Sequence, residues 1–158
     1  MNVTTLTATL PTADDTRALG RALAALLRPG DLLVLTGPLG AGKTVFAQGV
    51  GAGLGVPGAV TSPTFVIARV LRGGRLPFVH VDAYRLGGID EVDDLDLDAD
   101  VDASVTLVEW GAGLVEQLAA AYCEIRLEPT EGEVRTAELL GYGGDWPDRL
   151  AKLELPDR

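Results

Sequence analysis

Residues 32–45 read LLVLTGPLGAGKTV: an apolar run passes directly into a glycine-rich turn and then into a segment of helical character. Within this stretch, residues 37–44 fit the phosphate-loop pattern G-x-x-x-x-G-K-[ST] at every position. In a chain with 20 glycines and two lysines, the number of such matches expected by chance is on the order of 0.003. A buried-type strand before the loop and a helix after it are the setting that supports this motif. The stretch therefore predicts an α/β fold with a loop that binds a nucleoside triphosphate.

The chemistry of a triphosphate assigns a role to each part of this loop. Its glycines let backbone N–H groups turn inward around phosphate oxygens, and the helix that begins near Lys43 adds its positive end. Lys43 is expected to reach the β- and γ-phosphates, and the hydroxyl of Thr44 to ligate Mg²⁺. The predicted ATP contacts form one run: Leu39, Gly40, Ala41, Gly42, Lys43, Thr44 and Val45.

Two acidic residues are candidates to complete the site. A phosphate loop needs a carboxylate at the end of a neighbouring strand to coordinate Mg²⁺ and to position a water. Asp82 follows the apolar run LPFVHV, and Glu109 follows VTLV, so both should lie at the sheet edge that carries the loop. We assign Glu109 to Mg²⁺ and Asp82 to the water or to the outer coordination of the metal; the opposite assignment stays open. The alternative for each acid alone is that it only ends a strand at the surface.

Two further residues are candidates for the same site. The stretch 61–65, TSPTF, follows the loop's helix, where many phosphate-loop enzymes hold a threonine that senses the γ-phosphate. Thr64 is the candidate, and a plain turn built on Pro63 is the alternative. His80 lies two residues before Asp82 and on the same strand face, so its ring is placed to orient that carboxylate. A structural histidine is the alternative.

Patterning around the loop predicts one α/β domain over residues 1–158, three-layer and P-loop NTPase-like, with a mixed (parallel plus antiparallel) central sheet. Thr12 and Asp15 predict a capping box at the first helix, which Pro29-Gly30 should end. Arg72-Gly73-Gly74 predicts the turn of a hairpin. The expected elements are a helix at 12–28, a strand at 32–36, a helix at 43–54, hairpin strands at 65–71 and 75–82, a strand at 105–110, a helix at 114–122, and strands around 123–129 and 134–140.

Composition narrows the classes of function. The 158 residues are 47% apolar and carry a net charge of −10, with a pI of about 4.4. Nucleic-acid binders usually show a basic patch, which this chain lacks, so a direct grip on tRNA or DNA is not expected. No apolar run approaches the ~18 residues of a membrane span, and the N-terminus does not resemble a secretory signal, so we expect a cytoplasmic protein. The single cysteine, Cys123, excludes an internal disulfide and fits a core position. The eight acidic residues of 88–102 predict a solvated face; docking on a basic partner is the alternative.

Four motifs together resemble one family: GPLGAGKT at 37–44, SPTF at 62–65, HVDAYRL at 80–86 and VEW at 108–110. In this order and spacing they are similar to the TsaE family of bacterial ATPases in tRNA threonylcarbamoyladenosine biosynthesis. The resemblance implies a subunit that works with a threonylcarbamoyl transferase and its inactive paralogue, and that meets tRNA only through the complex. By this resemblance, the complex places the threonylcarbamoyl group on adenosine 37 of tRNAs reading codons that begin with A. Slow ATP hydrolysis by this subunit would reset the complex between turnovers.

The family pattern also implies roles for particular residues. Thr44 and Glu109 would hold Mg²⁺, Asp82 would serve hydrolysis, and Thr64 would lie in a switch-like loop. Contacts to the adenine are expected from outside the phosphate loop, at Thr12, Thr16 and Arg135.

Three other functions use the same kind of loop. A small-molecule kinase needs an arginine-bearing lid, and residues 111–158 show no arginine cluster of that kind. A GTPase switch needs an Asn-Lys-x-Asp stretch, which the chain does not contain. A scaffold that binds ATP with negligible turnover would not need the pair Asp82 and Glu109.

Overall fold

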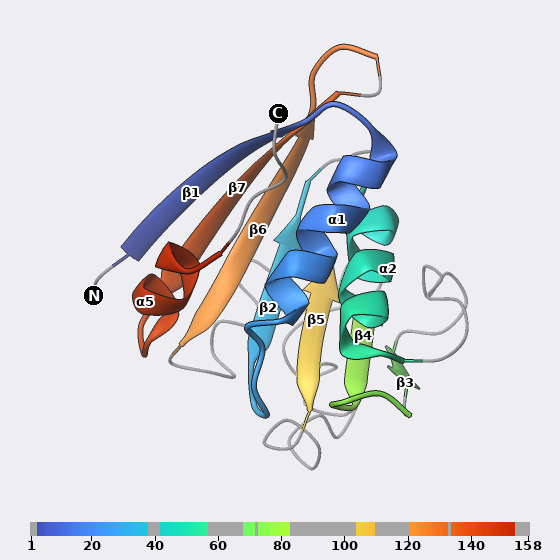
Figure 1. The fold of residues 1–158 in the computed structure, drawn as a ribbon, viewed down its shortest axis with the longest axis vertical. Coiled ribbons are helices and arrows are strands. Elements are labelled where there is room, and N and C mark those ends of the chain that lie inside the picture. Colours follow the sequence, from blue (N-terminus) through green and yellow to red (C-terminus); the bar gives the residue numbers. More distant parts are fainter. Residues whose placement is uncertain are drawn as a thin grey trace.

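The computed structural model describes residues 3–37, 42–56, 68–71, 73–82, 104–109, 121–132 and 134–153. Within these residues, seven strands form one sheet in the order β1-β7-β6-β2-β5-β4-β3 (Figure 1). The elements in chain order are β1 Val3–Leu10, α1 Ala13–Ala24, β2 Leu32–Thr36, α2 Lys43–Leu54, β3 Ala68–Leu71, β4 Phe78–Asp82, β5 Val105–Glu109, β6 Tyr122–Pro129, β7 Arg135–Tyr142 and α5 Trp146–Ala151.

The sheet is mixed, as predicted. Strand β2 pairs in parallel with β5 and with β6, and β5 pairs in parallel with β4. Antiparallel pairs complete both sides: β3 with β4, and β7 with β6 and β1. The strand that leads into the phosphate loop therefore lies between two parallel neighbours, so its carboxyl end shares an edge with theirs.

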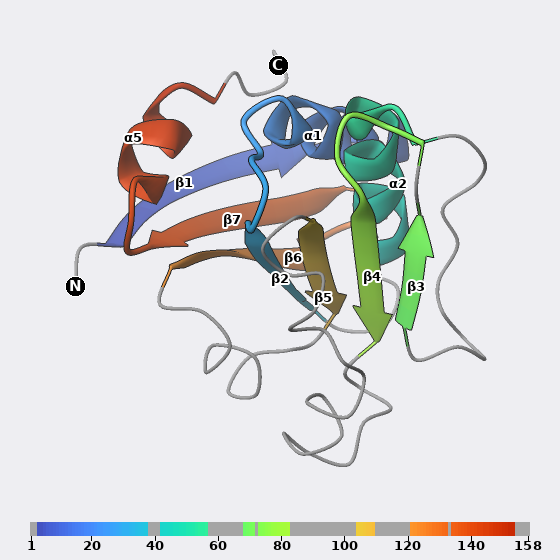
Figure 2. The ribbon, with the colours of Figure 1, turned by 90° about the horizontal axis from the view of Figure 1, so that it is seen from below.

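All the described helices lie on one face of the sheet (Figure 2). Helices α1 and α2 lie side by side over β2, β5 and β4, and α5 covers β1 and β7. The core between these helices and the sheet includes Leu19, Leu35, Phe46, Leu107 and Ile125, each fully buried.

The opposite face of the parallel strands is buried too, because Val34, Val81 and Val108 are all 0% exposed. Covering on both faces is what parallel strands require. The mixed α/β fold class is confirmed, and the layer expected on the second face lies outside the described residues.

Helices α1 and α2 meet backbone to backbone. A Cβ added at Gly20 would lie 2.4 Å from the carbonyl oxygen of Phe46, and one added at Gly49 would lie 2.1 Å from the carbonyl oxygen of Arg17. The absence of a Cβ at both positions allows this approach. Gly49 lowers the intrinsic helix propensity of α2, yet in the fold it brings the phosphate-loop helix against α1.

A buried ion pair ties the C-terminal helix to the start of β2. Asp31, directly before β2, accepts two hydrogen bonds from the Arg149 guanidinium, at 2.5 Å to Oδ2 and 3.0 Å to Oδ1. Each residue is 8% exposed. Arg149 also donates to Asp145 at 2.9 Å, and its guanidinium carbon lies 4.3 Å from the centroid of the Trp146 ring. Both members of the pair are thus satisfied, as buried charges must be.

Several predicted elements are confirmed, with shifted bounds. The capping box of Thr12 and Asp15 is present, but α1 ends at Ala24 instead of residue 28. After Ala24, the backbone N–H groups of Leu26 and Leu27 donate to carbonyl oxygens three residues earlier. The chain therefore has 3₁₀-type hydrogen bonds before it reaches Pro29-Gly30. The hairpin, β2, α2, β5, β6 and β7 are also found.

Two elements were missed, and one predicted helix is wrong at its end. Strand β1 alternates exposed Thr5, Thr7 and Thr9 with inward Leu6, Ala8 and Leu10, a strand signal that sequence reasoning passed over. Helix α5 is short and begins with Trp146 and Pro147. The helix predicted at 114–122 lies outside the described residues up to 120, and Tyr122 belongs to β6. The acidic run 88–102 is also outside the described part. Among the described residues, no helix has the length and apolarity needed to cross a membrane.

Candidate functional site

The phosphate loop joins the end of β2 to the start of α2. Gly42 is the N-cap of α2, at φ 97°, a left-handed conformation that favours glycine. No side chain caps this helix end, and its first turn holds no acidic residue. Within the described residues, no side chain competes with an anion for the backbone N–H groups at the N-terminus of α2. Three of the predicted contacts, Leu39, Gly40 and Ala41, lie outside the described residues.

The side chain of Lys43 contacts the first residue of the loop. Its ammonium donates a hydrogen bond of 2.9 Å to the carbonyl oxygen of Gly37, at the other end of the loop. This bond places a positive charge where the sequence predicts phosphates. Thr44 and Val45 follow in the first turn of α2, and both are half-buried.

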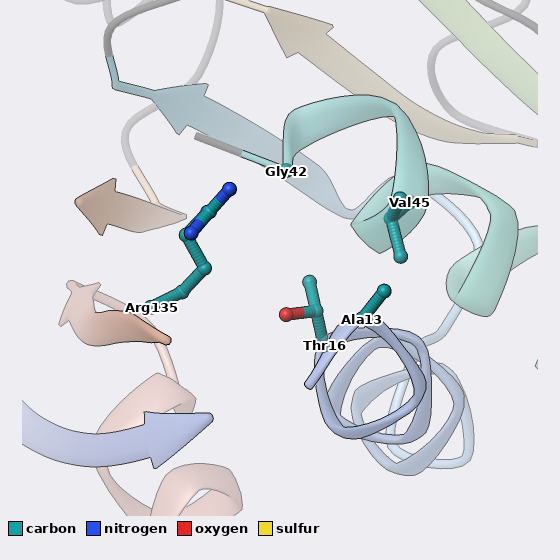
Figure 3. Close-up of a pocket in the computed structure, with 5 residues that line it drawn as sticks. All are labelled: Ala13, Thr16, Gly42, Val45 and Arg135. Carbon is teal, nitrogen blue, oxygen red and sulfur yellow. The ribbon is translucent and has the colours of Figure 1, made fainter. Parts of the chain in front are cut away.

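A small hollow lies beside this turn, and Figure 3 shows its lining residues. Its volume is about 90 Å³, and three elements contribute to it: α1, α2 with its cap, and β7. The methyl groups of Ala13 and Val45 face each other, and the Thr16 hydroxyl turns toward the side on which Arg135 lies. The lining residues are Ala13, Thr16, Gly42, Val45 and Arg135.

Of the residues expected to contact adenine, the structure brings two to the phosphate loop. Arg135 donates to the carbonyl oxygens of Gly132 and Val134, at 3.0 and 3.1 Å, which holds its guanidinium at the start of β7 beside the hollow. Thr16 lines the same hollow. Thr12 does not: its hydroxyl donates to the Asp15 carboxylate at 2.8 Å within the capping box. Its predicted contact with the nucleotide stays a prediction.

The two predicted acids are register partners at the carboxyl edge. Asp82, the last residue of β4, pairs with Glu109, the last residue of β5. Glu109 is also level with Leu35 of β2, two residues before Gly37. The parallel register therefore brings both acids to the edge where the loop begins, as predicted. Glu109 is 6% exposed; the side chain of Asp82 and all of Thr64 lie outside the described part.

His80 contacts a different acid from the one predicted. Its Nε2 lies 2.6 Å from Oε2 of Glu109, and the ring is fully buried. In the register His80 is level with Leu107, so Glu109 is its diagonal neighbour on the adjacent strand. The expectation that His80 orients Asp82 considered one strand only, whereas the observed contact is made to a neighbour on the adjacent strand; the side chain of Asp82 lies outside the described residues.

These residues fit ATP with Mg²⁺. An uncapped helix end and one ammonium suit the negative phosphates, while a hydroxyl on α2 and a carboxylate on β5 are the oxygen donors that Mg²⁺ prefers. Sequence reasoning named the loop, both acids and Arg135. It missed the carbonyl partner of Lys43 and the His80–Glu109 contact, which depend on loop closure and strand register.

Cys123 lies outside this site. It is 0% exposed within the core, and burial raises the pKa of its thiol far above the ordinary value. The core position is confirmed, and the thiol is not a nucleophile at neutral pH.

We expect the native protein to resist alkylation by iodoacetamide, whereas the chain unfolded in urea reacts readily. Because the folded pKa of the thiol is raised, the folded state keeps a proton that the unfolded chain loses above about pH 8.5. This residue's contribution to the free energy of unfolding should therefore fall as pH rises above that value. Urea titrations of the wild type and Cys123→Ala, from pH 7.5 to 9.5, measure the effect; a pH slope equal in both proteins would contradict it.

Residues 10–137 match the family described as threonylcarbamoyl adenosine biosynthesis protein TsaE. A tRNA threonylcarbamoyladenosine biosynthesis protein TsaE of Streptomyces coelicolor is 56% identical over 137 residues, which cover 82% of this chain and 93% of that protein. The protein of the same name from Bacillus subtilis is 39% identical, covering 91% of this chain and 90% of that protein.

A solved structure shares the fold. The crystal structure of YdiB of Bacillus subtilis superposes with a TM-score of 0.80 and 30% sequence identity, covering 96% of this chain and 95% of that chain. The matched family, the relatives and the shared fold agree with the motifs found at the sheet edge. The chain belongs to the TsaE family, which places it in the biosynthesis of threonylcarbamoyladenosine in tRNA.

Proposed function

We propose that this chain is a slow ATPase subunit of the assembly that attaches a threonylcarbamoyl group to adenosine 37 of tRNAs reading codons that begin with A. Its family supports the pathway. One observation carries the ATPase role: the ammonium of Lys43, the open N-terminus of α2 and the acids Asp82 and Glu109 share one edge of the sheet.

In this proposal each residue has one task. The N–H groups of the loop, with Lys43, bind the phosphates. Lys43 then exchanges the Gly37 carbonyl for phosphate oxygens, which are stronger acceptors because they are charged. Bound Mg²⁺ supplies positive charge that neutralises the β- and γ-phosphates. Thr44 and Glu109 hold that ion, Asp82 orients the attacking water, and Thr64 senses the γ-phosphate.

We further propose that the protein works in the cytoplasm with a threonylcarbamoyl transferase and its inactive paralogue. The net charge of −10 opposes direct binding to tRNA or DNA, so the partners supply the contact to tRNA. ATP hydrolysis resets the complex between turnovers.

Measuring tRNA nucleosides by mass spectrometry, in a strain depleted of this chain, tests the pathway role. Threonylcarbamoyladenosine should fall as the protein is depleted. Normal levels would refute the role in the pathway and leave the ATPase proposal intact. If the protein binds ATP without measurable phosphate release, even with its partners, a nucleotide-binding scaffold replaces the ATPase. Transfer of phosphate to a metabolite instead of water would indicate a small-molecule kinase.

Replacing Arg135 with alanine should raise the Kd for ATP about tenfold or more, because a hydrogen bond from a charged donor contributes roughly 1.5–3 kcal/mol. Calorimetry with Mg²⁺ and ATP measures the change. Arg126→Ala is the matched control, because Arg126 pairs with Glu124 and Glu138 on the opposite sheet face. Equal weakening in both variants would mean that net charge, not position, explains the effect.

A further inference from the structure

The pair of His80 and Glu109 is the only contact between an imidazole and a carboxylate in the described residues, and His80 is the only histidine of the chain. The ring is 0% exposed and Glu109 6%. The ring of Phe78, two residues earlier on β4, lies parallel to the His80 imidazole within 5°, with the ring centroids 6.0 Å apart. The ring is therefore held between neighbours and cannot swing away into solvent.

The 2.6 Å separation fixes what lies between the two groups. Two unprotonated acceptors would repel at this distance, so a proton lies between Nε2 of His80 and Oε2 of Glu109. The other ring nitrogen, Nδ1, is buried with no hydrogen-bond partner among the described residues. Among the described residues, Glu109 is thus the one hydrogen-bond partner of the imidazole.

Of the two Glu109 carboxylate oxygens, Oε2 has a hydrogen-bond partner in the described part of the chain. Within the described part of the chain, Oε2 of Glu109 contacts His80, while no hydrogen bond reaches Oε1. A nearly buried carboxylate needs at least one partner, and His80 supplies it. Oε2 is fixed against β4, and Glu109 itself stands at the carboxyl edge, level with Leu35 near the end of β2.

We infer that His80 is a positioning residue: it holds one oxygen of Glu109 so that the other can serve as the magnesium ligand beside the phosphate loop. Because the Glu109 side chain is already fixed, it loses little conformational entropy when Mg²⁺ binds. This inference rests on the proposed function, in which Glu109 holds Mg²⁺. A group that orients a metal ligand typically changes metal affinity by 10- to 100-fold when it is removed. A histidine that only satisfies the fold would leave metal affinity unchanged.

Two substitutions separate these roles. His80→Leu fills a similar volume with an apolar side chain and removes the N–H group that binds Glu109. His80→Gln keeps an N–H group near the position of Nε2. The probe is Mn²⁺, added in the presence of ADP. Its binding is measured as the decrease of the free Mn²⁺ signal in electron paramagnetic resonance. We expect His80→Leu to weaken Mn²⁺ binding at least tenfold and His80→Gln to restore most of it. ADP binding in EDTA, measured by calorimetry, should stay within twofold of the wild type.

A double variant tests whether the effect passes through Glu109. In a Glu109→Gln background, adding His80→Leu should weaken Mn²⁺ binding by less than twofold further. An undiminished effect in that background would overturn the inference, as would unchanged Mn²⁺ affinity in His80→Leu or failure of His80→Gln to recover it. If the wild type itself binds neither ADP nor Mn²⁺ with ADP, the proposed function fails instead.

A measurement on the unmodified chain covers the case in which the variants do not fold. Because the chain has a single histidine, its imidazole nitrogens give one pair of signals in ¹⁵N-resolved spectra. We expect Nε2 to carry a proton that exchanges slowly, and its shift to change when Mg²⁺ is added to the ADP-bound protein. A spectrum that does not respond to Mg²⁺ would overturn the inference without any substitution.

Discussion

Lys43→Ala is expected to abolish ATP hydrolysis and to weaken ATP binding at least a hundredfold. The ammonium lies 2.9 Å from the carbonyl oxygen of Gly37, so it is held at the first residue of the loop before a nucleotide arrives. Two charge-assisted hydrogen bonds to phosphate oxygens, at roughly 1.5–3 kcal/mol each, correspond to a loss of about two orders of magnitude or more. The other described residues around the loop offer no second ammonium to replace it.

Calorimetry with Mg²⁺ and ATP, together with a phosphate-release assay, measures both effects. The matched control is Lys152→Ala, which removes the only other lysine from an exposed position next to α5. It should leave both quantities unchanged. The melting temperature of Lys43→Ala should match that of the wild type, since no buried apolar contact is lost. If Lys43→Ala binds ATP with an affinity within a few-fold of that of the wild type, the proposal that the phosphate loop binds ATP through Lys43 is wrong.

Gly49→Ala is expected to destabilise the protein, although helix propensity alone predicts the opposite. In an exposed helix this change stabilises by about 1 kcal/mol. Here the new Cβ would lie 2.1 Å from the carbonyl oxygen of Arg17, so α2 must move away from α1 by more than an ångström. Overpacking of this kind costs about 1–3 kcal/mol and occasionally more. Because rigid backbone atoms receive the clash, we expect a cost above that range, about 3–4 kcal/mol, and hence a net loss of about 2–3 kcal/mol after the propensity gain.

Such a loss lowers the melting temperature of a chain of this size by about 4–12 °C. Ala52→Gly is the reciprocal control on an exposed position of α2, and it should cost about 1 kcal/mol through propensity. The displaced helix also carries Lys43 and Thr44, so ATP affinity should fall with stability. A melting temperature at or above that of the wild type would show that the two helices are not packed through Gly49.

Much of this fold could be predicted because its signals are local. The phosphate loop, the capping box of Thr12 and Asp15, and the Gly73-Gly74 turn each lie within a few residues of sequence. The structure has the capping box and the hairpin, and it describes residues 37 and 42–44 of the phosphate loop. The bounds of α1 and the short helix α5 were not predictable in this way. Both depend on tertiary packing, which overrides weak local preferences.

The candidate site likewise has features that could be predicted from local sequence and features that could not. Placing Asp82 and Glu109 together required only that parallel strands share a carboxyl edge, and the register confirms it. Which acid His80 contacts depends on the diagonal between two strands, and the role of Gly49 depends on how closely two helices approach. Neither quantity is written in one segment of sequence, because each belongs to a pair of segments that meet only after folding.

The ion pair between Asp31 and Arg149 also has a consequence for synthesis. These residues are 118 positions apart, yet Asp31 directly precedes the strand that ends in the phosphate loop. While α5 is still inside the ribosomal exit tunnel, the Asp31 carboxylate lacks the Arg149 guanidinium that offsets its burial. The start of β2 can therefore reach its buried, paired arrangement only once the chain has been synthesised as far as Arg149.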